Sequence, residues 1–317
     1  MINNNPENYP DSQAALNKIV FEYMREQKRK RIWRWVMRAL ILILIIWLLF
    51  QFSGYKDEDL TDKSKPHVGL IDISGTIFED QPGGSDNFAK SIDKAYESTS
   101  MKALIIRIDS PGGSPVQADY IYNTIQYYRK KTPEVKIYAV CVDACASAAY
   151  YIAAAADEIY ANPSSLVGSI GVLHNGFGFV DTMQKLGVTR RLATSGRNKG
   201  FLDQFSPEQP EQQQYLQAML NIIHQQFIAR VKEGRGKRLH IDDNTFSGLF
   251  WTGVQAKEMG LIDGFASAGQ LGRETIKLDN FVDYTHRDTI FERVAKNIGT
   301  AMANQLPTAL GLHSGFQ

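Results

Sequence analysis

The hydrophobic pattern of the 317-residue chain changes abruptly after its polar, basic first 32 residues. Residues 39–50 are all apolar, and residues 33–52, with Trp33, Trp35 and Phe52, reach the roughly 20 residues that a helix needs to cross a bilayer. The run is apolar on every face, begins too far into the chain for a signal peptide and lacks a clear cleavage site. We therefore expect a single transmembrane helix at residues 33–52.

Basic side chains gather on the N-terminal side of this run, at Arg25, Lys28, Arg29, Lys30, Arg31, Arg34 and Arg38. The positive-inside rule then predicts a cytoplasmic N-terminus, with everything after residue 52 across the membrane. The whole chain has 35 Lys and Arg against 34 Asp and Glu, a net charge of +1, which indicates no nucleic-acid partner.

Beyond a short polar tether at residues 53–66, apolar strand-like runs alternate with helix-compatible segments. Strands are expected at 67–73, 103–108 and 136–142, with helices at 88–98 and 116–131 between them. This alternation predicts an α/β fold with a parallel sheet covered by helices. Shorter strands are expected at 158–161, 170–173 and 189–192.

A long glutamine-rich helix is expected at residues 207–233, with one buried face formed by Leu216, Leu220, Ile223, Phe227 and Val231. We place the folded domain at residues 67–275 and a C-terminal helical extension at 276–317. Within that extension, residues 288–306 carry an apolar stripe of Ile290, Val294, Ile298 and Met302, which is expected to pack within the protein.

A serine among small residues follows the strand at 136–142. Ser147 lies between Ala146 and Ala148, ahead of the helix-forming residues 150–156. A strand, a tight turn, a serine and a helix resemble the nucleophile elbow of hydrolases, with alanine in place of glycine. A helix-capping serine in an ordinary turn is the alternative.

Two glycine-containing loops could complete such a site. Gly112 and Gly113 follow a buried strand, and their backbone N–H groups, together with that of Ala148, suit an oxyanion hole. Ser169 lies in a second tight turn, between Gly168 and Ile170. An ordinary strand-to-helix turn is the alternative for the first loop.

A serine nucleophile also needs a base. Lys199, in the loop of residues 194–200, could serve as a neutral amine, although its spacing alone is typical of a surface lysine. Among the six histidines His174 is placed best, so Ser147–His174 with Asp143 or Asp157 is a second hypothesis. His224 and His240 are expected in solvated positions.

Cofactor chemistry finds no support in the sequence. Cys141 and Cys145 lack the spacing of a zinc site or a disulfide framework, and they are interpreted as small buried hydrophobic residues. Neither a metal-binding motif such as H-E-x-x-H nor a dinucleotide fingerprint occurs. We therefore expect no cofactor and no metal.

Four motifs together resemble one known family. They are IDSPGG, ACASAAYYIAAAADEIYANPSSLVGSIGV, SGRNKGFLDQFSP and FWTGVQAKEMGLID, which occur in the family's order within residues 67–272. The combination is similar to the bacterial signal peptide peptidase A (protease IV) family in its short single-domain form, with SohB-type inner-membrane peptidases as the nearest relatives.

The resemblance implies a ClpP/crotonase-like superhelix of stacked ββα units and a Ser–Lys dyad. The family's nucleophile falls on Ser147 and its general base on Lys199. Ser169 falls where a serine helps to hold the lysine amine, and Gly113, with Gly112 beside it, falls where a glycine supplies an oxyanion N–H. The sequence departs from the family at Ala148-Ala149, where Gly-Gly is common, and the added methyl group could narrow the pocket.

The expected protein is thus a single-pass protein of the bacterial inner membrane, a serine endopeptidase with a periplasmic or extracytoplasmic catalytic domain. Its expected partners are signal-peptide remnants or other short hydrophobic peptides, membrane lipid, and further copies of itself in a ring whose neighbouring subunits could complete each active site. A non-catalytic scaffold that keeps the peptidase shell, a Ser–His hydrolase and a crotonase-type acyl-CoA enzyme are the alternatives.

Overall fold

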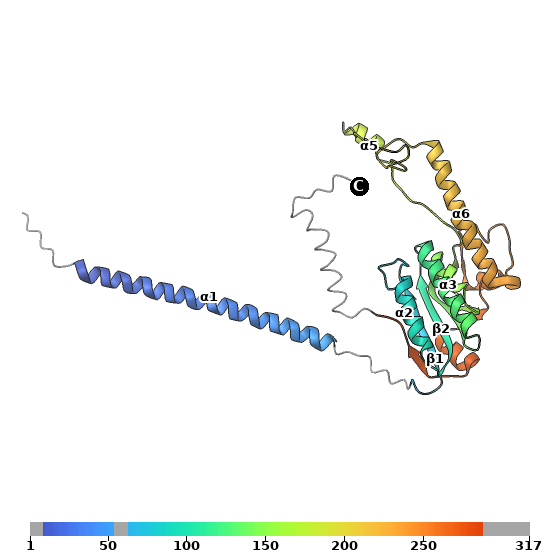
Figure 1. Ribbon diagram of the computed structural model, residues 1–317, viewed down its shortest axis with the longest axis horizontal. Coiled ribbons are helices and arrows are strands. Elements are labelled where there is room, and N and C mark those ends of the chain that lie inside the picture. Colours follow the sequence, from blue (N-terminus) through green and yellow to red (C-terminus); the bar gives the residue numbers. More distant parts are fainter. Residues whose placement is uncertain (1–8, 54–62, 288–317) are drawn as a thin grey trace, which may run out of the picture. The chain divides into compact units, whose positions relative to one another are not determined.

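The computed structural model describes residues 9–53 and 63–287 of the chain (Figure 1). Residues 60–287 form one compact unit, and the long N-terminal helix belongs to another, so each is described by itself. Most of the expected tether and the expected helix at residues 288–306 lie outside the described residues.

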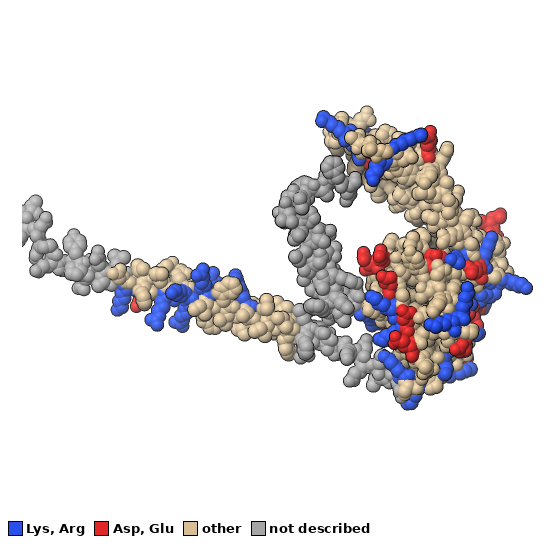
Figure 2. All heavy atoms as spheres, in the orientation of Figure 1, with Lys and Arg blue, Asp and Glu red and all other residues tan. Residues whose placement is uncertain are grey.

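Helix α1 spans Tyr9–Ser53, so it is continuous across the boundary expected at residue 32. Its only strong helix breaker is Pro10, which lies in the first turn, where proline is tolerated. Figure 2 shows the basic side chains gathered along part of this helix and an uncharged stretch after them. Within the described residues, no helix meets the length and hydropathy that a membrane crossing requires.

One mixed sheet organises the second unit. Its strands are β1 (His67–Ser74), β2 (Met101–Ser110), β3 (Lys136–Ala146), β4 (Glu158–Ala161), β5 (Leu166–Gly168), β6 (Phe250–Thr252), β7 (Gly264–Phe265) and β8 (Phe281–Asp283). The order is β6-β5-β3-β2-β1-β8, and β4 pairs with both β3 and β7. Every pairing is parallel except that of β5 with β6, which confirms the predicted α/β class.

The second unit also contains helices. They are α2 (Ser85–Tyr96), α3 (Pro115–Lys131), α4 (Ala148–Ala153), α5 (Val180–Lys185), α6 (Pro210–Arg235), α7 (Gly253–Glu258) and α8 (Ala268–Gln270), with a 3-10 turn at Gly236–Arg238 and a π-helical turn at Leu271–Ile276. In Figure 1, α2 and α3 lie along β1 and β2. The main core joins α2, α3, α4 and the C-terminal half of α6 to the sheet. A smaller apolar cluster lies around Val68, Ile105 and Leu271.

Three expectations differ from the structure. Residues 170–173 and 189–192 are not strands; the short strand in this region is β5 instead. Residues 281–283 form β8 against β1, so the sheet continues beyond residue 275, where a helical extension was expected. Within α6, burial is confined to the C-terminal half, at Phe227, Ile228, Val231 and Arg235.

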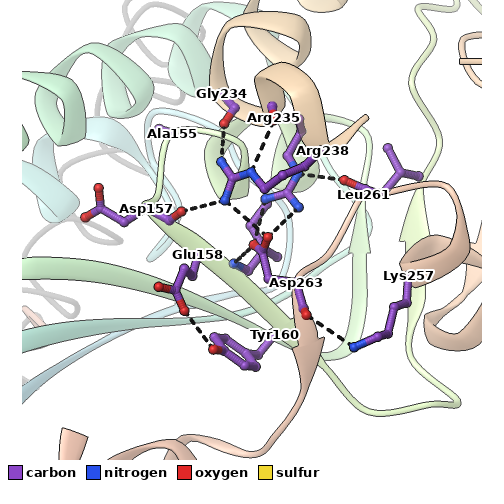
Figure 3. A network of polar contacts seen from close by, with 12 residues as sticks. Ala155, Asp157, Glu158, Tyr160, Gly234, Arg235, Arg238, Lys257, Leu261 and Asp263 are labelled. Carbon is purple, nitrogen blue, oxygen red and sulfur yellow. Dashed lines mark hydrogen bonds and ion pairs between the residues drawn. The ribbon is translucent and has the colours of Figure 1, made fainter. Parts of the chain in front are cut away.

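A network of hydrogen bonds and ion pairs joins the C-terminal end of α6 to the sheet (Figure 3). The Arg235 side chain is fully buried, and both of its terminal nitrogens donate to Asp263 at 2.8 and 2.9 Å. Asp263 also accepts from the Ile159 N–H at 2.7 Å and from Arg238 at 3.1 Å. The network therefore joins α6 to β4 and to the chain before β7.

Candidate active site

The end of β3 carries Ser147 in an unusual backbone conformation. Its φ is 55° and its ψ is −125°, a region that residues other than glycine rarely adopt. The turn is held because the Ser147 N–H donates to the Gly168 carbonyl at 2.8 Å, while its carbonyl accepts from the Tyr151 N–H at 3.0 Å. Backbone strain of this kind gathers at functional sites, and here it places a half-buried serine between a strand and a helix.

Ser169 follows the neighbouring strand in the same way. Ala146 pairs with Gly168 across β3 and β5, so Ser147 and Ser169 each come directly after a paired residue. Ser169 has a φ of 51°, and its N–H donates to the Leu249 carbonyl at 2.8 Å. The structure therefore brings these two serines to the same end of two adjacent strands.

The glycine loop after β2 lies against the serine turn. Gly112 has a φ of 111°, and a Cβ placed on it would lie 2.7 Å from the Ser147 Cβ and 3.2 Å from the Ala148 nitrogen. A Cβ on Gly113 would lie 2.3 Å from the Ile77 carbonyl oxygen. Any side chain at either position would thus push the loop away from its neighbours.

The Gly113 N–H faces the serine side of this loop. Ile77 bonds to the residues on both sides of Gly113: its N–H donates to the Gly112 carbonyl at 3.0 Å, and its carbonyl accepts from the Ser114 N–H at 2.8 Å. In a parallel bridge of this kind, the N–H of the central residue points to the opposite side, which here is the side of β3.

The Ala148 N–H is the second donor expected here. It belongs to the first residue of α4, where an N–H has no partner within the helix. The Ala148 side chain is 4% exposed and forms part of the main core. Its methyl group is therefore buried in the core at the start of α4.

Lys199 is not brought to Ser147 within one chain. It lies in an arm, residues 171–209, which carries α5 and reaches the end of α6 that is remote from the sheet (Figure 1). Lys199 is exposed, and its amine has no hydrogen-bond or ion-pair partner among the described residues. A single chain thus presents the serine and the lysine on separate parts of the fold.

The arm has an internal structure of its own. Arg190 pairs with Asp203 at 2.6 Å, and Phe179 stacks on Phe205 with ring centres 5.4 Å apart. A cavity of about 740 Å³ lies between the arm and the first half of α6. Several apolar side chains on the arm and on this part of α6 are largely exposed, namely Leu173, Phe177, Leu186, Val188, Tyr215 and Ile222.

No contact between Ser147 and His174 occurs among the described residues, so the Ser–His hypothesis has no support from the geometry. His174 is exposed and lines the arm cavity. Asp157 is occupied at the opposite end of β3, where it pairs with Arg129 and accepts from the Ile137 N–H at 2.8 Å. His224 was expected to be solvated, but it is half-buried, and its Nε2 lies 3.0 Å from the Ile170 carbonyl. That bond joins α6 to the chain beside Ser169, and the helical periodicity gave no sign of it.

The two cysteines are buried free thiols, as predicted. Burial raises the pKa of the Cys145 thiol well above its ordinary value, which keeps the thiol protonated and unreactive. No group of His, Cys, Asp and Glu suited to a metal ion occurs within the described residues. The candidate chemistry at this end of the sheet is therefore that of hydroxyl and backbone N–H groups.

Comparison with known proteins shows which family part of the chain is similar to. Residues 129–280 match the model of peptidase family S49, a range that contains Ser147, Ser169 and Lys199. The predicted resemblance to the signal peptide peptidase A (protease IV) family is confirmed by this match and by relatives with those names. Gly112 and Gly113 lie ahead of the matched range.

Several curated relatives are named as proteases. A putative protease of Synechocystis is 29% identical over 253 residues, which cover 74% of this chain and 89% of the relative. A putative signal peptide peptidase SppA of Enterococcus faecium is 27% identical over 197 residues, 62% of this chain and 57% of the relative.

A relative with another name has a higher identity. A Na(+)/H(+) antiporter NhaA of Brucella abortus is 44% identical over 184 residues, which are 58% of this chain. The match spans only 25% of that protein. The antiporter name describes the much longer protein as a whole and is not carried over to this chain.

Proposed function

We propose that this protein is a serine endopeptidase with Ser147 as nucleophile and Lys199 as general base. The observation that carries the proposal is the positive φ of Ser147, beside a glycine loop so close that a Cβ added to Gly112 would lie 2.7 Å from the Ser147 Cβ. The family match and the protease names of several relatives support the same reaction class. A ClpP/crotonase-like fold is part of the proposal, supported by the successive parallel strands and covering helices.

The proposed mechanism requires the Lys199 amine to reach Ser147. A neutral Lys199 amine removes the Ser147 proton as Oγ attacks the peptide carbonyl, and the Gly113 and Ala148 N–H groups stabilise the oxyanion. The protonated amine then donates its proton to the leaving amine, and an acyl-enzyme remains on Ser147. Water, deprotonated by Lys199, hydrolyses that ester and regenerates both groups. Ser169 accepts a hydrogen bond from the protonated amine and keeps it in position.

Two copies of the chain are needed for this dyad in our proposal. The arm that carries Lys199 extends away from Ser147, and its exposed apolar side chains suit contact with another subunit. A ring in which the arm of one subunit reaches the serine of its neighbour would satisfy both observations. Heterologous contacts of this type close into rings when the rotation between subunits allows it.

Short hydrophobic peptides, such as remnants of signal peptides, are the proposed substrates. A relative named as a putative signal peptide peptidase supports this choice. We further propose that residues 33–52 anchor the protein in the bacterial inner membrane, with an extracytoplasmic catalytic domain. The twelve consecutive apolar residues at 39–50, with basic residues before them, support the anchor. Retention of the chain in a carbonate-washed membrane fraction, and its loss on deletion of residues 33–52, would test the anchor.

Cleavage of a fluorogenic hydrophobic peptide by the purified full chain tests the dyad. Ser147→Ala and Lys199→Ala should each reduce turnover by about 10⁴-fold or more without unfolding the protein. Covalent labelling of Ser147 by a fluorophosphonate should accompany activity. If the folded wild type is neither labelled nor active, the protein is better explained as a non-catalytic scaffold. If Lys199→Ala is active and His174→Ala is inactive, a Ser–His hydrolase is favoured.

A further inference from the structure

Strand β3 has a bulge just before the nucleophile turn. Cys141 pairs with Ile108 of β2, but the next recorded pair is Cys145 with Ser110. Three residues of β3, 142–144, thus lie opposite the single residue Asp109. A bulge of this kind interrupts the ladder and redirects the strand that follows it, which here is the segment that ends at Ser147.

The other neighbour of β3 is interrupted at the same place. Cys141 pairs with Ala161, the last residue of β4, and Ala144 pairs with Leu166, the first residue of β5. Some backbone N–H and C=O groups of residues 142–144 therefore lack hydrogen-bond partners from the strands on either side. Backbone groups that lose ladder partners need other hydrogen-bond partners, from side chains or from water.

Two side chains from neighbouring loops supply those partners. The Asp109 carboxylate accepts a hydrogen bond from the Ala144 N–H at 3.1 Å. The Ser165 hydroxyl, which is buried, donates to the Val142 carbonyl and lies 3.3 Å from the Cys141 carbonyl. Ser165 is itself fixed because its Oγ accepts from the Asn162 N–H at 3.0 Å.

Asp109 also belongs to the loop that forms the other half of the site. Its own carbonyl accepts from the Gly75 N–H at 3.0 Å, and Gly112 follows three residues later. A Cβ added to Gly112 would clash with the Ser147 Cβ, so the two loops lie close together and a small shift between them changes the distance from Oγ to the oxyanion donors. A bond from Asp109 to the bulge therefore links the glycine loop to the nucleophile strand.

We infer that Asp109 and Ser165 are positioning residues for the peptidase reaction. They clamp the bulge at residues 142–144 and thereby set Ser147 against the N–H groups of Gly113 and Ala148. The inference rests on the proposed function, since it concerns the geometry of the same site. Neither side chain contacts the substrate in this account, and each acts through the backbone of β3.

The test compares turnover of a fluorogenic peptide by Asp109→Ala, Asp109→Asn and Ser165→Ala with that of the wild type. Asp109→Ala and Ser165→Ala should lower kcat by about 10- to 100-fold with little change in KM, because a misplaced nucleophile slows the chemical step. Asp109→Asn keeps an oxygen acceptor for the Ala144 N–H, and kcat should recover to within about threefold of the wild type.

Asp157→Ala is the matched control. It removes a carboxylate that accepts from the Ile137 N–H, at the opposite end of the same strand. Its unfolding temperature should fall, whereas the kcat of the folded protein should stay within about twofold of the wild type. Thermal unfolding of every variant separates a general loss of stability from displacement of Ser147.

Three results would overturn the inference. They are an unchanged kcat in both Asp109→Ala and Ser165→Ala, equal losses in Asp109→Ala and Asp109→Asn, or a kcat loss in Asp157→Ala as large as theirs. If Asp109→Ala does not fold, Ser165→Ala decides the outcome. An active Ser147→Ala would overturn the proposed function and the inference together. An inactive Ser147→Ala with unchanged positioning variants would overturn the inference alone.

Discussion

Gly112 leaves no space for a methyl group beside the nucleophile. Its φ of 111° is unfavourable for other residues, and an added Cβ would lie 2.7 Å from the Ser147 Cβ. We expect Gly112→Ala to lose about 1–2 kcal/mol of stability through backbone strain. Its kcat should fall by about 100-fold, because the loop and the serine must move apart. Urea unfolding and peptide turnover measure the two effects.

Gly75→Ala provides the control for strain alone. Gly75 also has a positive φ, of 75°, but an added Cβ would meet nothing within 4 Å. This variant should lose similar stability and keep its kcat within about twofold of the wild type. A comparable loss of kcat in both variants would contradict a specific role for Gly112 beside Ser147.

At the residue scale, the sequence predicted that Ser147 and Gly112 follow adjacent strands, and parallel strands bring their carboxyl ends together. Ser169 was expected ahead of a strand at 170–173, but it follows β5 instead. The clamp formed by Asp109 and Ser165 could not be predicted, because it depends on extra residues in the pairing of β3. Periodicity within one strand contains no information about such a shift in register.

An ion pair of the buried Arg235 with Asp263 joins α6 to the chain before β7 (Figure 3). Burial opposes ionisation of the Asp263 carboxyl, but hydrogen bonds and charge from Arg235 outweigh it, and the net result is a lowered pKa. A carboxyl whose pKa is lower in the folded state stabilises the fold above its unfolded pKa. That contribution is lost as the pH falls below the ordinary value of 3.8 and through the folded pKa.

Asp263→Asn should therefore destabilise the protein most at neutral pH. Its buried Arg235 keeps a charge without a carboxylate partner, which costs about 3–5 kcal/mol. The difference from the wild type should begin to shrink near about pH 5 and continue to shrink as the pH falls below 3.8 and through the folded pKa. Urea unfolding at several pH values measures this. The exposed pair of Glu26 and Lys30 is the control, since Glu26→Gln should change stability by less than about 1 kcal/mol.

At the scale of elements, the long periodic segments could be predicted, but β4 is the only short strand that was predicted, at residues 158–161. The continuous apolar run of β2 indicated a strand buried on both faces, which the structure confirms. β6 and β8 have only three residues each, so their strand conformation depends on partners far away in the chain. The spacing in α6 predicted a helix with one apolar face, but the fold covers only its C-terminal half.

At the scale of the whole molecule, the separation of Ser147 from Lys199 determines how the active site can form. Lys199 lies in the arm, together with exposed apolar residues such as Phe177 and Leu186. A sequence alone could not show this separation, because the loop spacing that matches a dyad is the same for a site within one chain and a site between two. The extension of the arm beyond the sheet favours a site that is formed between two chains (Figure 1).

Complementation between two inactive variants distinguishes these arrangements. Chains with Ser147→Ala still supply Lys199, and chains with Lys199→Ala still supply Ser147. Co-expressed in equal amounts and randomly assembled, they should regain about one quarter of wild-type activity if neighbouring subunits share each site. Sites built within one chain would regain none. The control mixes Ser147→Ala with the double variant Ser147→Ala/Lys199→Ala, which contains no intact Ser147 and should stay inactive. Full inactivity of the first mixture, with normal assembly by size-exclusion chromatography, would contradict a shared site.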